Sequence, residues 1–488
     1  MELTDYFAIL GVPPTADEQT IRDAYRQAAR RFHPDANTSP GAEVLFKDIN
    51  RAYEVLSDSQ QRRAFEQLWQ DSASTTPGLK IETILSRGAL SPLDEPQVLY
   101  ALLRLHPQVD QAPIATSAPL NLCIVIDRST SMKGPRLQAV KAAVHQIIDQ
   151  CSREDVLSVV TFSDSAAVLV PATPLNDPRQ AKSLVSTLRA DGATAIYQGL
   201  RFGLREIERY RDPRYVNHMV LITDGRTYGD EDDCLTLASD AHALGVGISG
   251  MGIGEDWHDE FIDELVSRTG GSSTYVSSSQ IATHFLNERV RSLATAYAER
   301  ARLVAAPAPG IEIESIFRLA PDPMPLNLSP QPIPLGTIDA AKGSTVLMQL
   351  NITTGATPRE ALYVSRLDVE ARMLGTRPYF ERIRDEIVVE VTPTEKPLDP
   401  PPVIIDALSR LALYKLQDRA QEALESGNVE YATRKLEYLA TRLFESGQDK
   451  LAEAALYEAR RVIHTHRLSE SGSKELKYGT RALLPPIG

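Results

Sequence analysis

The chain has 488 residues, 42% hydrophobic and 24% charged, which is ordinary for folded globular protein and long enough for three or four domains. A net charge of −13 without a basic domain argues against nucleic acid as the main partner, and three cysteines without a CxxC pair exclude a disulfide framework. The acidic amino-terminal sequence and the lack of a long apolar run predict a cytoplasmic protein with no membrane insertion.

The first 69 residues have the pattern of a short helix followed by a helical hairpin. The sequence DYFAILGV (5–12) predicts the short helix, and apolar residues at helical spacing predict two longer helices over 18–32 and 46–58. His33-Pro34-Asp35 follows the second helix directly and lies in the loop of the hairpin. Three arginines recur at i, i+4 and i+8 on the second helix, and we call them the basic stripe: Arg22, Arg26 and Arg30.

Together these features resemble the J domain of DnaJ-type co-chaperones, over residues 1–69. The resemblance implies an all-α domain that docks onto the ATPase side of a DnaK-type chaperone, with the tripeptide acting at the linkage that governs ATP hydrolysis. The basic stripe would meet an acidic patch of the chaperone, which mainly sets the rate and orientation of association. Asp23 and Gln27 depart from the family, because many J domains carry more Lys or Arg there. The residues implied in chaperone binding are His33, Pro34, Asp35, Arg22, Tyr25, Arg26 and Arg30.

After a short polar linker (70–78), β-patterning occurs in two separate stretches, 79–118 and 300–397. Clusters of proline, glycine and aspartate divide these stretches into short strands. We expect the two stretches to form one composite antiparallel β-sandwich, with another domain inserted between them. Two unrelated small β units remain the alternative.

Between these stretches, two buried strands each end in an acid. The run NLCIVIDRSTSM (121–132) leads into Asp127, with Ser129 and Ser131 at the next alternate positions, and HMVLITDGRT (218–227) ends in Asp224. An amphipathic helix, a β-run and a loop that carries Thr194 lie between the two strands. Acids and hydroxyls at the ends of parallel strands converge on one crevice, and a hard cation prefers oxygen ligands.

This arrangement resembles the von Willebrand factor A domain and its metal-ion-dependent adhesion site, over residues 119–299. The resemblance implies a doubly wound α/β domain that binds Mg²⁺ (or Mn²⁺). Ser129, Ser131 and Thr194 would touch the metal, whereas Asp127 and Asp224 would act mainly through water. The remaining position would accept a carboxylate from a protein client. The alternative is an ordinary turn rich in Ser, Thr and Asp.

From residue 401 the pattern is helical. Three amphipathic helices over 403–424, 429–446 and 449–464 predict a helical domain (401–467), either a bundle packed on the body or a peptide-binding groove. A tail (468–488) follows a polar linker, and Thr480 within it is a possible phosphorylation site. The interpretation that we favour is that Leu476, Tyr478, Leu483 and Leu484 pack the tail against the body, with Thr480 unmodified.

The fold expected from the sequence is therefore multidomain: an all-α J domain, a β-sandwich with an inserted α/β domain, and a carboxy-terminal helical bundle. No catalytic triad, HExxH motif or P-loop occurs, so we expect no enzymatic activity. The predicted function is that of a J-domain co-chaperone that stimulates a DnaK-type ATPase and recruits clients through a Mg²⁺-dependent adhesion site. The alternative is an accessory subunit of a metal-inserting or remodelling ATPase complex.

Overall fold

The computed structural model describes residues 5–72, 78–92, 95–108, 118–227, 229–353, 361–375, 378–392 and 399–484. The chain forms two compact units, and each contains residues from distant parts of the sequence. The first unit comprises Met1–Ala118, Leu293–Pro321 and Pro325–Ile404. The second unit comprises Pro119–Ser292, Asp322–Met324 and Ile405–Gly488.

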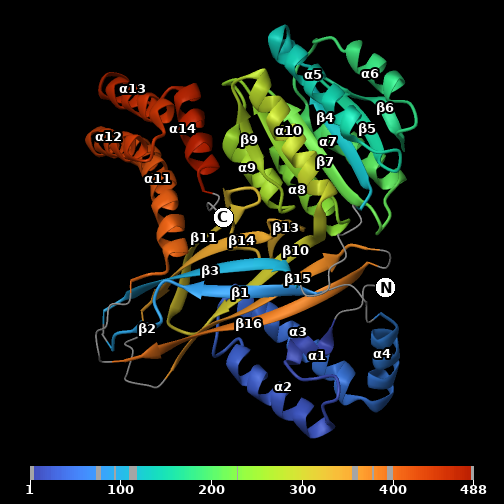
Figure 1. The fold of residues 1–488 in the computed structure, drawn as a ribbon, viewed down its shortest axis with the longest axis vertical. Helices are drawn as coiled ribbons and strands as arrows, with labels where there is room; N and C mark the ends of the chain where they lie inside the picture. Colours follow the sequence, from blue (N-terminus) through green and yellow to red (C-terminus); the bar gives the residue numbers. More distant parts are fainter. Residues whose placement is uncertain are drawn as a thin grey trace. The chain divides into compact units, whose positions relative to one another are not determined.

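Four helices form the amino-terminal part of the first unit (Figure 1): α1 (Tyr6–Leu10), α2 (Glu18–Phe32), α3 (Pro40–Ser57) and α4 (Ser59–Ser72). α3 begins six residues before the expected start, because the Ser39 hydroxyl caps the helix and proline is favourable in its first turn. α4 was not expected from the sequence, and Asp58 accepts hydrogen bonds from the amides of Gln60 and Gln61 at its start. The apolar faces of α1, α2 and α3 enclose one core, to which Phe65 of α4 also contributes.

Two five-stranded sheets complete the first unit. The first sheet has the order β1 (Leu79–Leu85), β3 (Gln97–Pro107), β14 (Ser344–Ile352), β11 (Ile311–Ala320) and β12 (Met324–Pro325). The second has the order β13 (Ile333–Asp339), β10 (Ala296–Pro307), β15 (Leu362–Met373), β16 (Tyr379–Val391) and β2 (Ala89–Leu90). β3 pairs with β14 over its length, so the two β-rich stretches of the sequence form one composite structure. Its second stretch begins at Ala296 and not at residue 300.

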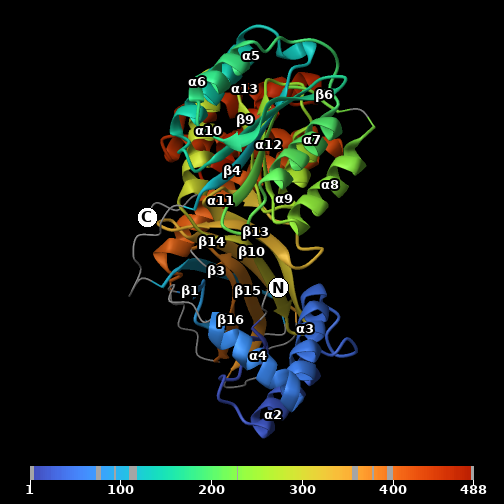
Figure 2. The ribbon, with the colours of Figure 1, turned by 90° about the vertical axis from the view of Figure 1, so that its right-hand side faces the viewer.

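The helical hairpin packs directly on the second sheet of the same unit (Figure 2). Gly41 of α3 lies so close to β10 that a Cβ atom there would be 2.0 Å from the carbonyl oxygen of Ala305. Val304 and Ala306 of β10 belong to the core of the hairpin. The four helices therefore share buried apolar surface with the sheet and are not simply tethered to it.

A chain of buried charges continues this contact. Arg366 of β15 donates a hydrogen bond of 2.8 Å to the carbonyl oxygen of Ile9, and its guanidinium also bonds to Asp368. Asp368 accepts a second arginine, Arg382 of β16, which also pairs with Asp48 of α3 at 2.7 Å. Burial opposes the charge of Arg382, but the carboxylates of Asp368 and Asp48 outweigh it and raise the pKa of this guanidinium.

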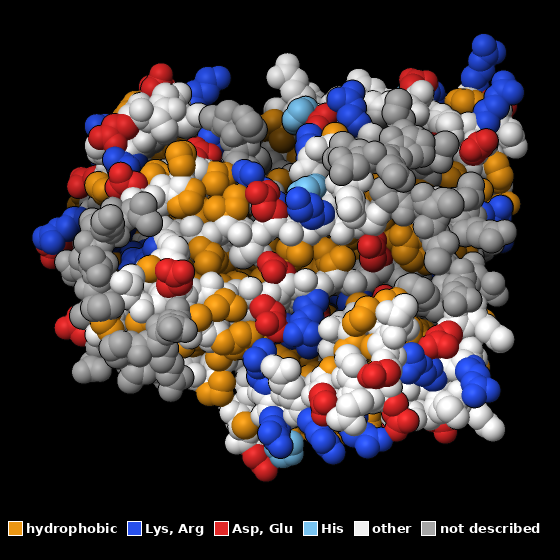
Figure 3. Space-filling model, turned by 60° about the horizontal axis from the view of Figure 1, so that its bottom comes forward, with side chains coloured by type: hydrophobic (Ala, Val, Ile, Leu, Met, Phe, Trp, Pro, Cys, Tyr) orange, Lys and Arg blue, Asp and Glu red, His pale blue; other side chains and the backbone are white. Residues whose placement is uncertain are grey.

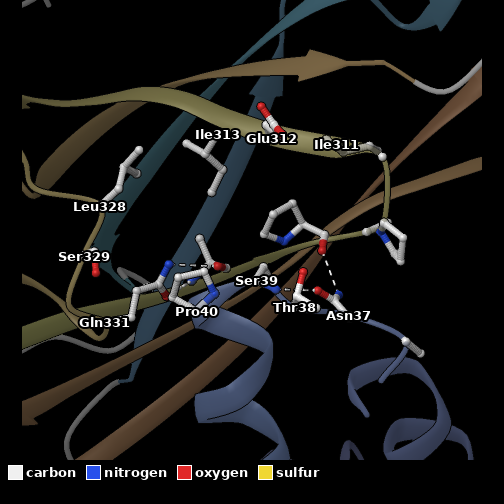
Figure 4. A pocket seen from close by; sticks show the side chains of 16 residues that line it. Asn37, Thr38, Ser39, Pro40, Ile311, Glu312, Ile313, Leu328, Ser329 and Gln331 are labelled. Carbon is white, nitrogen blue, oxygen red and sulfur yellow. Dashed lines mark hydrogen bonds between the residues drawn. The ribbon is translucent and has the colours of Figure 1, made fainter. Parts of the chain in front are cut away.

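A pocket of about 480 Å³ lies at the junction between the hairpin loop and the sandwich (Figure 4). Asn37 closes one side, where its side-chain amide donates to the carbonyl oxygen of Pro307 at 2.9 Å and its carbonyl accepts from the amide of Ser39. Ile313 of β11 and Leu328 line the opposite side. The loop that follows residues 33–35 is thus held to the sandwich by a buried hydrogen bond.

A six-stranded sheet with helices on both faces forms most of the second unit. Its order is β6 (Ala166–Pro174), β5 (Val156–Phe162), β4 (Leu120–Asp127), β7 (Val216–Thr223), β8 (Gly247–Ile253) and β9 (Ser273–Val276). β6 is antiparallel to β5, and the other strands are parallel. The helices are α5 (Pro135–Gln150), α6 (Pro178–Ser186), α7 (Ile196–Arg209), α8 (Glu231–Ala243), α9 (Asp259–Ser267) and α10 (Ser279–Ala294). β4 and β7 are buried along their whole length, as their apolar sequences predict.

The carboxy-terminal helices are α11 (Pro402–Glu425), α12 (Val429–Glu445), α13 (Asp449–Thr465) and α14 (Glu470–Ala482). α14 corrects the expectation of a tail over 468–488, of which residues 485–488 lie outside the described part. Ser469 caps this helix, and Leu476 and Leu484 are fully buried. Within the described residues, no helix combines the length and apolarity that a membrane span requires.

α14 also contacts the α/β domain within the second unit. Arg481 pairs with Asp263 of α9 at 2.7 Å, Lys477 pairs with Asp259 at 2.6 Å, and the ring of Tyr478 lies 5.7 Å from that of Trp257. Thr480 is fully buried, and its hydroxyl donates to the carbonyl oxygen of Leu476. Phosphorylation of Thr480 would therefore require α14 to leave its place in the fold.

Candidate functional site

The tripeptide His33-Pro34-Asp35 is exposed at the end of α2. The side chains of His33 and Asp35 keep 49% and 92% of their surface accessible. His33 Nδ1 accepts a hydrogen bond from the amide of Asp35 at 3.2 Å, and the imidazole lies edge-on to Phe46 of α3. The loop conformation is therefore fixed from within the hairpin, while the polar groups of the tripeptide remain available to a partner.

The basic stripe is accessible but partly neutralised by its own helix. Arg22 pairs with Glu18 at 2.5 Å, and Arg26 lies 3.8 Å from Asp23, the acid at which the sequence departs from the J-domain pattern. Surface pairs of this kind contribute little to stability, but they reduce the charge that a partner meets. On the face of the molecule in Figure 3, basic side chains are likewise interspersed with acidic ones.

Tyr25 has a structural role in this geometry. Its ring stacks on Tyr53 of α3 at 4.0 Å, and its hydroxyl donates to Asn50. Arg31, which the sequence did not single out, contacts the sandwich, with its guanidinium 4.1 Å from the centre of the Tyr363 ring and 3.3 Å from Glu386. Both residues help to hold α2 in place.

The second candidate site lies at the carboxyl ends of β4 and β7. These strands are parallel neighbours, and Ile126 is in register with Ile222, so Asp127 and Asp224 emerge at the same edge of the sheet. Both carboxylates are fully buried. Ser129 and Ser131 follow Asp127 at the short helix η2 (Thr130–Met132), which turns the chain back across this edge.

Hydrogen bonds connect four of the five predicted residues. The Ser131 hydroxyl donates to Asp224 Oδ1 at 2.7 Å and lies 3.0 Å from the hydroxyl of Ser129. The amide of Ser129 donates to Asp127 Oδ1 at 2.8 Å, and the Thr223 hydroxyl donates to Asp127 Oδ2 at 2.6 Å.

Thr194, the fifth predicted residue, reaches the same edge from the loop before α7. The amide of Asp191 donates to the carbonyl oxygen of Arg128, and the amide of Thr130 donates to that of Gly192, so this loop is docked on the Asp127 loop. A Cβ atom at Gly225 would lie 3.0 Å from the Thr194 hydroxyl oxygen, so Thr194 lies next to the residue that follows Asp224. The structure thus places all five residues at one edge of the sheet.

The site carries more negative than positive charge. Burial, reinforced by the nearby Asp224 carboxylate, raises the pKa of Asp127 to about 6, against the opposing hydrogen bonds from Thr223 and Ser129. Arg136 of α5 is the cation in contact, with Nη1 2.6 Å from Asp224 Oδ2. The arginine thus contacts one of the two buried carboxylates, Asp224, whereas Asp127 is held by hydrogen bonds from Ser129 and Thr223.

The donor set fits a hard divalent cation. Two carboxylates and three hydroxyls supply only oxygen, which Mg²⁺ prefers, and the unbalanced negative charge favours a cation. Among the described residues no group of three or more His, Cys, Asp or Glu side chains converges, so a nitrogen- or sulfur-ligated centre is not formed there. Arg136 and Thr223 were missed from the sequence. A detectable signal existed for Arg136, because a cation is unfavourable in the first turn of a helix.

Comparison with known proteins matches three regions. Residues 5–66 match the DnaJ domain, residues 121–289 the von Willebrand factor type A domain, and residues 402–486 the Sll0103-like C-terminal α-helical domain. The chain joins a DnaJ domain to a von Willebrand factor type A domain. The predicted fold class is therefore confirmed, including the carboxy-terminal helical region. This region continues beyond its expected limit of residue 467.

Relatives resemble the chain only in part. The uncharacterized protein sll0103 of Synechocystis is 29% identical over 217 residues, which cover 44% of this chain and 51% of that protein. A curved DNA-binding protein of Salmonella choleraesuis is 56% identical over 70 residues, 14% of this chain and 23% of the relative. The chain therefore spans about half of the first relative and about a quarter of the second.

Two solved structures share the fold. A von Willebrand factor type A protein from Catenulispora acidiphila superposes with a TM-score of 0.65 at 16% identity, covering 84% of this chain and 97% of that one. The ArnB paralog VWA2 from Sulfolobus acidocaldarius gives a TM-score of 0.50 at 14% identity, with 84% and 99% covered. At these identities the likeness concerns the fold.

Proposed function

We propose that this protein is a non-enzymatic co-chaperone whose DnaJ domain stimulates a DnaK-type ATPase and whose VWA domain binds clients through Mg²⁺. The observation that supports the first part is the exposure of His33-Pro34-Asp35 on a DnaJ domain anchored to a sandwich. Buried contacts hold the domain through α1, α3 and the loop after the tripeptide, while His33, Asp35 and the basic stripe stay accessible.

The anchoring gives the tripeptide a defined direction. Asn37 lies two residues after Asp35 and bonds to Pro307 of the sandwich, and Arg31 lies two residues before His33 and contacts Tyr363. A DnaK-type chaperone that engages the tripeptide would therefore be oriented relative to the sandwich as well as to the DnaJ domain. A fixed orientation reduces the entropy lost when a chaperone and a client are brought together.

Single-turnover ATPase measurements test this part of the proposal. The full chain should raise the rate of a cognate DnaK-type chaperone, and His33→Gln should abolish the increase. The replacement leaves the core intact, because His33 is half exposed in a loop. His464→Gln on the exposed surface of α13 is the matched control. Equal stimulation by the wild type and His33→Gln would overturn the co-chaperone function.

We further propose that Mg²⁺ or Mn²⁺ binds at the edge of the VWA sheet. Ser129, Ser131 and Thr194 would hold the ion directly, and the two aspartates would hold its water ligands. The bound ion would supply a site for a carboxylate of the client. The oxygen-only donor set and its excess negative charge support this proposal.

Calorimetry with MgCl₂ and MnCl₂ tests the metal site. We expect binding of one ion per chain and loss of binding in Ser131→Ala, which removes a proposed ligand from an exposed residue and leaves the apolar core unchanged. Asp149→Ala, on the exposed face of α5, should bind like the wild type. No heat of binding at millimolar ion concentrations would refute the metal site.

A further inference from the structure

Arg136 occupies an unfavourable position on its helix. It stands in the first turn of α5, directly after Pro135, where the helix dipole disfavours a positive charge. Its guanidinium is nevertheless directed to the metal edge of the VWA sheet, where it pairs with Asp224 Oδ2 at 2.6 Å. The favourable partner of Arg136 is therefore the buried carboxylate and not its own helix.

Both carboxylate oxygens of Asp224 accept hydrogen bonds. The two donors differ in whether their hydrogen bonds are compatible with a bound cation. The Ser131 hydroxyl can donate to Oδ1 while its oxygen lone pair faces a metal, so this bond is compatible with an ion. Arg136 has only donors and a permanent positive charge, so at Oδ2 it competes with a metal-bound water and repels the ion.

Space for a displaced arginine exists beside the site. A pocket of about 750 Å³ is lined by Arg136 together with Gly254, Glu255 and Tyr275. A Cβ atom at Gly254 would lie 2.6 Å from the Arg136 guanidinium, so the glycine leaves room for this side chain. Glu255 provides a carboxylate in the same pocket. Arg136 is one-third exposed, so its side chain can move without opening the core.

We propose that Arg136 is an internal counter-ion of the metal site: it neutralises Asp224 when no ion is bound, and an incoming divalent ion displaces it toward the Glu255 pocket. This inference rests on the proposed metal site and adds to it a residue that sets its affinity. The exchange makes ion binding weaker than the five ligands alone would give. When no metal is bound, the ion pair between Arg136 and Asp224 keeps the loops of the VWA domain ordered.

Calorimetric titration of the full chain with MgCl₂ tests the inference through Arg136→Gln. The variant should bind Mg²⁺ about tenfold more tightly, as expected when a competing charge-assisted hydrogen bond is removed. Arg136→Lys keeps the charge and should bind more weakly than Arg136→Gln. Arg226→Gln is the matched control. Arg226 lies two residues after Asp224 in the sequence and pairs with Glu470, but it does not contact Asp224.

Thermal unfolding provides a second measurement. Without metal, Arg136→Gln should melt at a lower temperature than the wild type, because Asp224 loses its counter-ion. Saturating Mg²⁺ should then raise its melting temperature by more than it raises that of the wild type. Wild-type binding with equal or weaker binding by Arg136→Gln would overturn the counter-ion role and leave the metal site standing. Absence of binding in both proteins would overturn the metal site and the counter-ion role together.

Discussion

Replacing Asp368 by asparagine should detach the DnaJ domain from its sandwich. Asp368 is fully buried on β15, where it accepts hydrogen bonds from Arg366 at 2.6 and 2.8 Å and from Arg382 at 3.1 Å. Arg366 then reaches the carbonyl oxygen of Ile9, and Arg382 reaches Asp48 of α3. The carboxylate is the one anion that both buried arginines share.

The free energy lost in Asp368→Asn depends on the buried arginines that the variant leaves without their anion. Arg366 has no accessible side-chain surface, and its Nη1 atom already lacks a hydrogen-bond partner among the described residues. Arg382 keeps Asp48, which is 36% exposed, but Arg366 would keep no anion in contact within the described part of the chain. Removing one partner of a buried ion pair costs about 3–5 kcal/mol. We expect a loss of this size for the interface between the DnaJ domain and the sandwich.

Glu370→Gln is the matched control, because Glu370 is on the same strand and the same face, two residues away. Its partner Arg302 is 40% exposed, so the loss should be no more than about 1 kcal/mol. Because a chain of several domains does not unfold in one step, local hydrogen exchange is the suitable assay. The amides of α3 and β15 should lose protection in Asp368→Asn by a factor between about 100 and about 4,000, because each 1.4 kcal/mol corresponds to a tenfold change. Equal protection in the two variants would refute the reasoning.

Four further outcomes are expected. Gly41→Ala should push α3 away from Ala305 and weaken the interface between the DnaJ domain and the sandwich. Gly88→Ala should not, because Gly88 has open space around it, and hydrogen exchange of the α3 amides compares the two variants. Asp263→Asn should release α14, at a cost of about 3 kcal/mol, because it leaves Arg481 buried without its anion; limited proteolysis within α14 measures this. Burial disfavours the Asp263 carboxylate, but Arg481 and Lys477 outweigh this effect and hold the pKa of Asp263 below 3.8. The stabilisation of the fold by this carboxylate is therefore complete above about pH 4 and declines in more acidic solution. Thr480→Glu should also expose α14 to protease, because it buries a charge, whereas Thr465→Glu on the exposed end of α13 should not.

Local patterns in the sequence predicted most of the helices and strands, with α4 and α14 as exceptions, and indicated the main residues of both candidate sites. The tripeptide at 33–35 lies in a hairpin loop because amphipathic helices flank it, and Asp127 and Asp224 lie at one sheet edge because each ends an apolar strand. Such patterns repeat over a few residues, so they can be detected without knowing what packs against them. The sequence also indicated that the β-rich stretches on either side of the VWA domain belong together, although it left the alternative open.

Only the tertiary structure decided which charged groups meet. Asp48 is far from Asp368 and Arg382 in the sequence, and nothing near any of the three residues indicates a buried network. Asp224 and Arg136 likewise come from distant parts of the sequence. The polar sequence of α14 suggested a tail, and only the fold provided Asp263 and Trp257 as partners for its basic and aromatic residues. A charged side chain has the same sequence pattern whether it faces water or a buried partner. Its role is set by burial and by the opposite charge that the fold brings to it.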